Sequence, residues 1–299
     1  MRLTENLRIA LNSLRTNKLR AALTMLGIMI GVAAVITLLS IGDGVTRFVA
    51  EQFSGLGTNL VFIVPTQEEQ GRPGSDPLSE SSLTIRDADL LADSARVPGI
   101  TAVSPVLLRD VELQFEGNSD NVTIRAGNTS YVDIINYEVV RGRMFDEPEY
   151  NGRSRVAVIG ADTVDELFPE NIDPLGADIK VDGLSFRIIG VLGARGAGGF
   201  GGASQDDILV IPLTTAQERL FNNRSQRDGS LLADAILIEA ASEEEVDAVI
   251  IDASDVLRQS HEINFRDQDD FQILTQQDFI SALGSVTGVL TLFLGAIAS

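Results

Sequence analysis

The chain has 299 residues, with 23 Lys and Arg, 43 Asp and Glu, one His and no Cys, and a net charge of −20. So acidic a chain is not expected to bind nucleic acid, because that needs a basic surface against the phosphates. The lack of Cys excludes disulfides and Cys-ligated metals, and a single His excludes multi-histidine metal sites. We therefore expect no cofactor and no metal. A hydrophobic content of 44% allows a large core.

Residues 1–20 are basic, with five Lys or Arg residues and one acidic residue. Leucines repeat at helical spacing in residues 3–14, which is typical of an amphipathic helix at the inner membrane surface. A basic flank that only anchors the next segment explains the same residues equally well. We predict that residues 1–20 are cytoplasmic, because Lys and Arg beside a span favour that side.

Residues 21–42 form an uncharged run between Arg20 and Asp43. As a helix rising ~1.5 Å per residue, this run is long enough to cross a hydrocarbon core of ~30 Å. A secretory signal peptide is the alternative, but its apolar region is usually shorter and ends in a small-residue cleavage site, which this run lacks. We predict a transmembrane helix, after which the chain is outside the cytoplasm.

Residues 43–278 are predicted to form an extracytoplasmic α+β domain from hydrophobic alternation, turn residues and capping pairs. In its first half, a helix continues the span and ends near Gly55 and Gly57, followed by a strand at 59–65 and a polar loop at 66–82. The next helix is opened by Thr84 and Asp87, with Leu90, Leu91 and Ala95 facing inward. A strand from 100 and two strands at 111–127, joined by a GNSDN turn, complete this half.

The second half of this domain is expected to be richer in strands. It begins with a strand and helix at 153–168, a hairpin at 178–192 that turns at Asp182-Gly183, and a strand at 207–213. A helix with a capping box from Thr214 to Gln217 and a strand at 233–240 follow. The last two elements are a strand at 270–276 and, before it, a helix opened by a capping box at 242–245, with one apolar face formed by Val246, Val249, Ile250, Ala253 and Leu257.

Two strand–helix–strand units, near 59–108 and 233–275, bracket a region of strands and turns. We therefore predict two subdomains outside the membrane. One is discontinuous and built from the βαβ units; the other is β-rich and inserted at about 111–225.

Residues 279–299 form a second uncharged run of 21 residues. Its length suits the start of a second transmembrane helix that returns inward. No basic residue follows to anchor it, so we expect either a piece of a longer membrane protein or a minimal two-span protein. A buried core helix is the alternative.

Both apolar runs contain glycines four residues apart, Gly27 with Gly31 and Gly284 with Gly288. Small residues at this spacing let helix backbones approach closely in a membrane. These four glycines are our candidate helix-packing residues, although glycine is also common in membrane helices as background.

The sequence contains no complete catalytic motif. The two lysines, Lys18 and Lys180, follow Asn17 and Ile179, so neither completes a Walker-type phosphate loop. Gly196, Gly198 and Gly201 match a dinucleotide pattern, but the next segment reads as a strand rather than the helix such a site needs. We expect no catalytic residue and read these glycines as a loop.

The remaining polar candidates are read as solvated surface. His261 follows a predicted helix and is expected to be an exposed loop histidine. The acidic groups at 206–207, 243–245 and 269–270 lack the spacing of a calcium-binding loop. We expect them to be surface charges.

An ordered set of segments resembles the MacB-type (MacB/FtsX/Lol-type) ABC transporter permeases over essentially the whole chain. The likeness begins in NSLRTNKLRAALTMLGIMIGVAAVITLLSIGDG and continues through FSGLGTNLVFIVP, RGRMFDEPEYNGRSRVAVIGADTVDELFP, DPLGADIKVDGLSFRIIGVL, DDILVIPLTTAQERLF and FQILTQQDFI. The resemblance implies four spans in the cell membrane, with a large extracytoplasmic domain between the first two. No single motif is diagnostic, but the ordered set is specific.

The resemblance also implies partners. Such permeases dimerise with themselves or a second permease, pair with ATP-binding subunits, and often work with a periplasmic adaptor protein. We expect a separate ATPase subunit, with this chain as a non-catalytic permease that transmits movement or exports drugs, peptides or lipoproteins. A second hypothesis is a two-span extracytoplasmic sensor or structural protein. A signalling domain in the parent gene would favour the second.

Overall fold

The structure is a computed structural model that describes residues 16–54, 59–66, 83–169, 172–195, 204–225 and 228–279, with residues 281, 282, 285, 288 and 289. The predicted amphipathic helix at 3–14, nearly all of the polar loop, the glycines at 196–201 and Gly284 lie outside these residues. The chain divides into two compact units. One contains residues 1–51 and 277–299, and the other contains residues 52–276.

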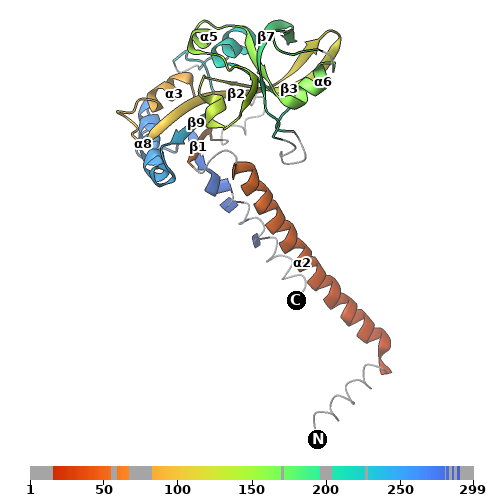
Figure 1. Cartoon of the computed structure of the whole chain (residues 1–299). Helices are drawn as coiled ribbons and strands as arrows, with labels where there is room; N and C mark the ends of the chain where they lie inside the picture. The colour runs from red at the N-terminus through yellow and green to blue at the C-terminus, as the bar shows by residue number, and fades with distance from the viewer. Residues whose placement is uncertain are drawn as a thin grey trace. The chain divides into compact units, whose positions relative to one another are not determined.

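The first unit contains α2 (Lys18–Ser54), one continuous helix of 37 residues (Figure 1). It covers the predicted span and continues past Asp43, which confirms that the apolar helix extends beyond the uncharged run. Its segment Lys18–Gly42 is, among the described residues, the one helix whose length and composition suit a membrane crossing. Large apolar side chains on it are exposed, Ile28, Met29 and Ile30 by more than 60%. A helix that is apolar all round requires an apolar environment.

The second unit contains a sheet in the order β10-β1-β9-β2-β3-β8-β5-β7-β4. Its first four strands are antiparallel: β1 (Leu60–Pro65), β2 (Ile100–Phe115), β9 (Ala235–Ala240) and β10 (Phe271–Thr275). Helix α3 (Ile85–Leu91) connects β1 to β2, and α8 (Val246–Ser260) connects β9 to β10. This is a pair of split βαβ units, as in ferredoxin-like folds. Both predicted βαβ units are present.

Helices α3 and α8 cover one face of these four strands (Figure 1). Val61 and Ile63 of β1 point into this layer, where they meet Leu91 of α3 and Val249 of α8. The predicted apolar face of α8 is confirmed. Alternate residues of the strands, such as Leu60, point to the opposite face and join a separate cluster with α4 (Tyr131–Ile134). The sheet is therefore buried on both sides.

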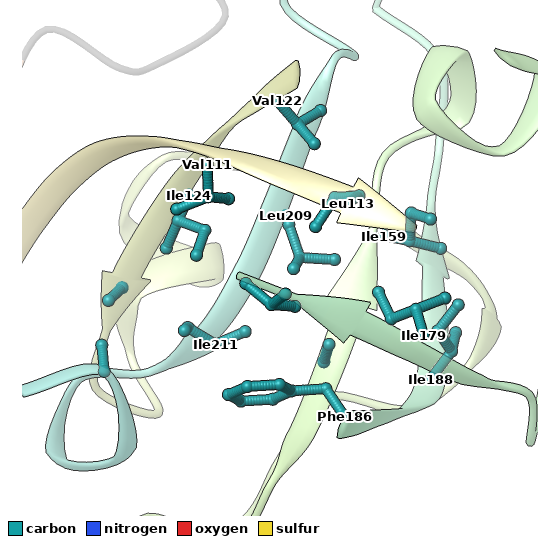
Figure 2. Close-up of a cluster of buried hydrophobic side chains, with 14 of the residues drawn as sticks. Val111, Leu113, Val122, Ile124, Ile159, Ile179, Phe186, Ile188, Leu209 and Ile211 are labelled. Atoms are coloured by element: carbon teal, nitrogen blue, oxygen red, sulfur yellow. The ribbon is translucent and has the colours of Figure 1, made fainter. Parts of the chain in front are cut away.

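The other strands form a ring. Going round it, β2 pairs with β3 (Asn118–Gly127), then follow β8 (Ile208–Pro212), β5 (Val156–Ile159), β7 (Leu184–Leu192) and β6 (Asp178–Val181), which pairs again with β2. Strand β4 (Val139–Gly142) lies outside the ring, on β7. The ring encloses a hydrophobic core that includes Leu113, Ile124 and Phe186 (Figure 2). Closure removes open strand edges.

Further short helices lie between the strands of the second unit. They are α5 (Glu147–Asn151), α6 (Ala161–Leu167), α7 (Leu213–Thr215), a π-helix at Ala216–Phe221 and a 3₁₀ turn at Glu243–Glu245 that precedes α8. Strand β2 belongs both to the four-stranded layer and to the ring. The inserted boundary near 111–225 remains a proposal, because residues 52–276 form one compact unit.

Three local predictions were wrong in detail. The turn after β2 is Glu116-Gly117, where both residues have positive φ, so most of GNSDN lies in β3. The helix at α7 already begins at Leu213, and the Thr214 hydroxyl donates to the Tyr150 carbonyl instead of capping. Helix α3 ends at Leu91, which leaves Ala95 outside it and exposed.

The side chain of Ser242 also does not cap the turn that follows it. The predicted capping box there is therefore wrong, although the helix itself is present. In contrast, the Asp182-Gly183 turn and the Thr84–Asp87 capping box are both confirmed. The φ values of +46° and +83° at the hairpin tip require residues that tolerate the left-handed region.

Candidate coupling site

The two strands that lead to the apolar segments are neighbours in the sheet. Strand β1 follows α2 after a short connection, and β10 runs straight into helical residues at 276–279. They are antiparallel, with Val61 opposite Thr275 and Pro65 opposite Phe271. The residue of β10 closest in sequence to the second apolar run thus lies beside the start of β1. Displacement of either strand must be shared with the other through their backbone hydrogen bonds.

This strand pair is embedded in the domain. Strand β1 also pairs with β9, and the side chains of Val61 and Ile63 are fully buried. Phe271 of β10 joins the same hydrophobic cluster under α8. Close-packed interiors transmit displacement because they have few voids to absorb it. The pair therefore forms a stiff connection from the segments before β1 and after β10 to the four-stranded layer.

A buried polar network fastens the start of β10, and its centre is His261. The prediction of a solvated loop histidine was wrong, because the side chain is completely buried where α8 ends. Nδ1 lies 2.7 Å from Oδ1 of Asp270, the residue before β10. Nε2 lies 3.2 Å from Oδ2 of Asp87 on α3, as an ion-pair contact rather than an aligned hydrogen bond.

Asp87 is the other buried member of this network. Oδ2 accepts hydrogen bonds from the backbone N–H of Thr84 at 2.9 Å and from its hydroxyl at 2.7 Å. Oδ1 accepts from the hydroxyl of Ser260 at 2.6 Å. Asp87 thus caps its own helix and holds the end of α8.

The electrostatics follow from these contacts. Burial alone would raise the pKa of Asp87, but the adjacent His261 ring and the hydrogen bonds from Ser260 and Thr84 lower it to about 2. Burial alone would lower the pKa of His261, but the carboxylates of Asp270 and Asp87 outweigh it and raise the pKa above 6.5. The network favours a charged imidazolium between two carboxylates.

Nearby charges are paired as well, which corrects the expectation of a solvated group at 269–270. Arg258 on α8 donates to Asp269 and to the carbonyl of Asn264. These bonds hold the connection between α8 and β10. The sequence predicted the Thr84–Asp87 pair of this network but not the contacts of His261, because Asp87 and His261 are far apart in the chain.

Three carboxylates meet elsewhere, on the ring of strands. Oxygens of Asp120, Glu166 and Asp207 lie within 4.8 Å of one another. The pKa of Glu166 is raised, first of all by the Asp120 carboxylate. A shared proton relieves such repulsion without a cation, so proximity alone assigns no metal here.

The segment that carries the glycine pattern is anchored at both described ends. The backbone N–H of Arg195 donates to both oxygens of Asp206, at 2.9 and 2.8 Å, and its guanidinium lies 3.7 Å from the Tyr137 ring centroid. Asp206 is only 1% exposed, so its reading as surface charge was wrong. The residues after it form strand β8, as predicted, which disfavours a dinucleotide site.

The candidate packing glycines lie on the apolar segments. Gly27 and Gly31 lie in α2, and Gly288 is helical. A Cβ built at Gly27 or Gly288 would meet no other described atom within 4 Å. Their packing against a neighbouring helix, within the subunit or across a dimer, therefore stays a prediction.

Comparison with known proteins identifies the domain. The family model described as the MacB-like periplasmic core domain matches residues 21–255. The chain belongs to this family. A macrolide export ATP-binding/permease protein from Rhodospirillum rubrum is 34% identical over 296 residues, which cover 98% of this chain and 42% of that protein. Its counterpart from Azoarcus sp. is 33% identical over 298 residues, covering 99% of this chain and 42% of that protein.

A third relative is a pyoverdine export ATP-binding/permease protein from Pseudomonas fluorescens. It is 30% identical over 284 residues, which cover 95% of this chain and 40% of the relative. The chain thus spans about two fifths of the length of the curated relatives it matches. The resemblance found in the sequence is confirmed, and the relatives are named as exporters with ATP-binding and permease functions.

Solved structures show the same fold. The periplasmic region of MacB from Actinobacillus actinomycetemcomitans has a TM-score of 0.60 at 20% identity, over 79% of this chain and 97% of that one. The extracellular domain of the noncanonic ABC-type transporter YknZ from Gram-positive bacteria has a TM-score of 0.54 at 16% identity, over 73% of this chain and all of that one. The MacB-like core fold is therefore present.

Proposed function

We propose that this chain is the permease part of a MacB-type ABC transporter, which converts ATP hydrolysis by a separate ATPase subunit into movement of its extracytoplasmic domain. The observation that carries the proposal is the pairing of β1 with β10. Each strand follows or precedes an apolar segment, so movement in the membrane reaches one stiff layer outside it.

The proposed topology puts residues 1–20 in the cytoplasm, 21–42 across the cell membrane, 43–278 outside, and 279–299 at the start of the return span. It is supported by the basic first segment, by α2, and by the periplasmic description of the matched family. The bilayer is therefore a partner of the two apolar segments.

The assembly we propose is a dimer of permeases, with itself or a second permease, on two ATPase subunits. A periplasmic adaptor protein completes the export path for a drug, peptide or lipoprotein. Support comes from the names of the relatives, which combine export, ATP binding and permease functions. Neither lysine of this chain completes a phosphate-binding loop, so catalysis is assigned to the partner subunit.

A reconstitution experiment tests this function. The permease and its ATPase subunit are placed together in lipid vesicles, and ATP turnover and export are followed. We expect the chain alone to show no saturable ATP binding and export to require both subunits. Saturable ATP binding by this chain would overturn the assignment of ATP hydrolysis to a separate subunit. ATP turnover and export that do not depend on the permease would favour the sensor or structural alternative.

A further inference from the structure

We propose that His261 is a proton-controlled latch, whose protonated ring fastens the start of β10 to helix α3 through Asp270 and Asp87. The latch is a property of the outer domain itself and goes beyond the transport function. Only its exposure to the pH outside the cell depends on the proposed topology.

The geometry selects the protonated ring. Nδ1 lies 2.7 Å from an oxygen of Asp270 and Nε2 lies 3.2 Å from an oxygen of Asp87, so each ring nitrogen has a carboxylate within ion-pair distance, although only the Nδ1 contact is an aligned hydrogen bond. A neutral imidazole has one N–H, and its other nitrogen presents a lone pair. In the neutral form one nitrogen would therefore oppose a carboxylate. The charged form carries an N–H on both nitrogens, and its positive charge attracts both carboxylates.

Among the residues that the structure describes, the charged groups near the ring other than Asp87 and Asp270 are themselves paired or exposed. Arg258, the basic residue of the last turn of α8, is paired with Asp269. Arg86 of α3 is paired with Asp228 at 3.6 Å, and Glu262 is exposed. Phe271 of β10 meets the imidazole edge-on, with centroids 5.9 Å apart. The two carboxylates thus dominate the charge facing the ring.

The three residues of the latch belong to three different segments of the domain. His261 ends α8, Asp87 is in the first turn of α3, and Asp270 immediately precedes β10. The proton on His261 therefore strengthens the attraction among three segments that also meet through the Ser260–Asp87 hydrogen bond and a shared hydrophobic cluster. The segment whose attachment depends on this proton is the strand that runs into the second apolar run and lies beside β1.

The direction of the pH effect follows from the two pKa shifts. The raised pKa of His261 gives stability that is complete below 6.5 and is lost as pH rises through the folded value. The lowered pKa of Asp87 gives stability that is complete above 3.8 and is lost as pH falls through about 2. The latch is therefore closed in mildly acidic medium and opens as pH rises through the raised pKa of His261.

The single histidine makes the test direct. The full chain, labelled with ¹³C in histidine and kept in detergent, is titrated by NMR, because every imidazole signal then belongs to His261. We expect a titration midpoint above that of the same histidine in the urea-unfolded chain. Asp270→Asn should lower the midpoint, whereas Asp255→Asn, an equal charge change on the exposed face of α8, should leave it in place.

Hydrogen exchange supplies the second measurement. Protection of the β10 amides, corrected for intrinsic exchange, should fall as pH rises through the His261 midpoint, and His261→Gln should remove this dependence. A wild-type midpoint at or below the unfolded value would overturn the latch. Equal pH dependence in His261→Gln would also overturn it. If His261→Gln does not fold, an Asp270→Asn midpoint equal to wild type overturns it instead. None of these measurements requires ATP or transport.

Discussion

Val61 of β1 lies directly opposite Thr275 of β10, although 213 residues separate them in the chain. The first leads back to α2 and the second leads on to the second apolar run. Because β1 and β10 are hydrogen-bonded neighbours in one antiparallel ladder, the segment before β1 and the segment after β10 join the sheet next to each other. In the transporter that we propose, movement of the two apolar segments would therefore act on one layer instead of on two independent points.

The capping box of α3 stabilises this layer. Thr84→Ala removes a fully buried hydroxyl that accepts from the Asp87 N–H and donates to its carboxylate. We expect a loss of about 1–2 kcal/mol in the free energy of unfolding, the usual value for an N-cap, measured by urea unfolding of the chain in detergent.

Ser242→Ala is the matched control, because the Ser242 side chain stands at a helix start without capping it. Its effect should stay within about 0.5 kcal/mol. Equal losses in the two variants would show that the Thr84 cap is not a special contributor.

Local signals explain which parts of this fold were predictable. The apolar run of α2, the Asp182-Gly183 turn and the Thr84–Asp87 pair each carry their structure within a few residues. The Glu116-Gly117 turn was missed because Glu rarely adopts positive φ, and only the pairing of β2 with β3 imposes it here.

The candidate site was far less predictable, because its contacts are distant in sequence. The spacing of residues around His261 resembles an ordinary loop, and the partner Asp87 is supplied by another element. Likewise, the two βαβ units were visible in the sequence, but the register that puts β10 beside β1 was not. Strand order depends on packing of the whole layer, which no local pattern encodes.

Membrane topology is open to a direct labelling test. The chain has no cysteine, so a single introduced thiol is the only reactive one. We expect a cysteine at Asp255, exposed on α8, to react with an impermeant maleimide in intact cells, and one at Asn12 to react only after permeabilisation. The reverse pattern would contradict the proposed orientation.

The glycine pair in α2 is expected to face another helix in the assembled transporter. Gly31→Leu should impair assembly and export, because a larger side chain separates backbones and lipid offers no hydrophobic compensation. Val35→Leu, one turn further on the same face, should have a mild effect. Assembly and export that are normal in Gly31→Leu would show these glycines to be background.

The most direct test of mechanical coupling is to lengthen the segment between β10 and the second apolar run. A Gly-Ser-Gly-Ser insertion between Gln277 and Asp278 is compared with the same insertion at the exposed Glu116-Gly117 turn. ATP hydrolysis and export are then measured in vesicles containing the permease and its ATPase subunit. The account predicts that the first insertion abolishes export while ATP hydrolysis continues, and that the turn insertion preserves both. Export unchanged by a flexible link at Gln277 would contradict it.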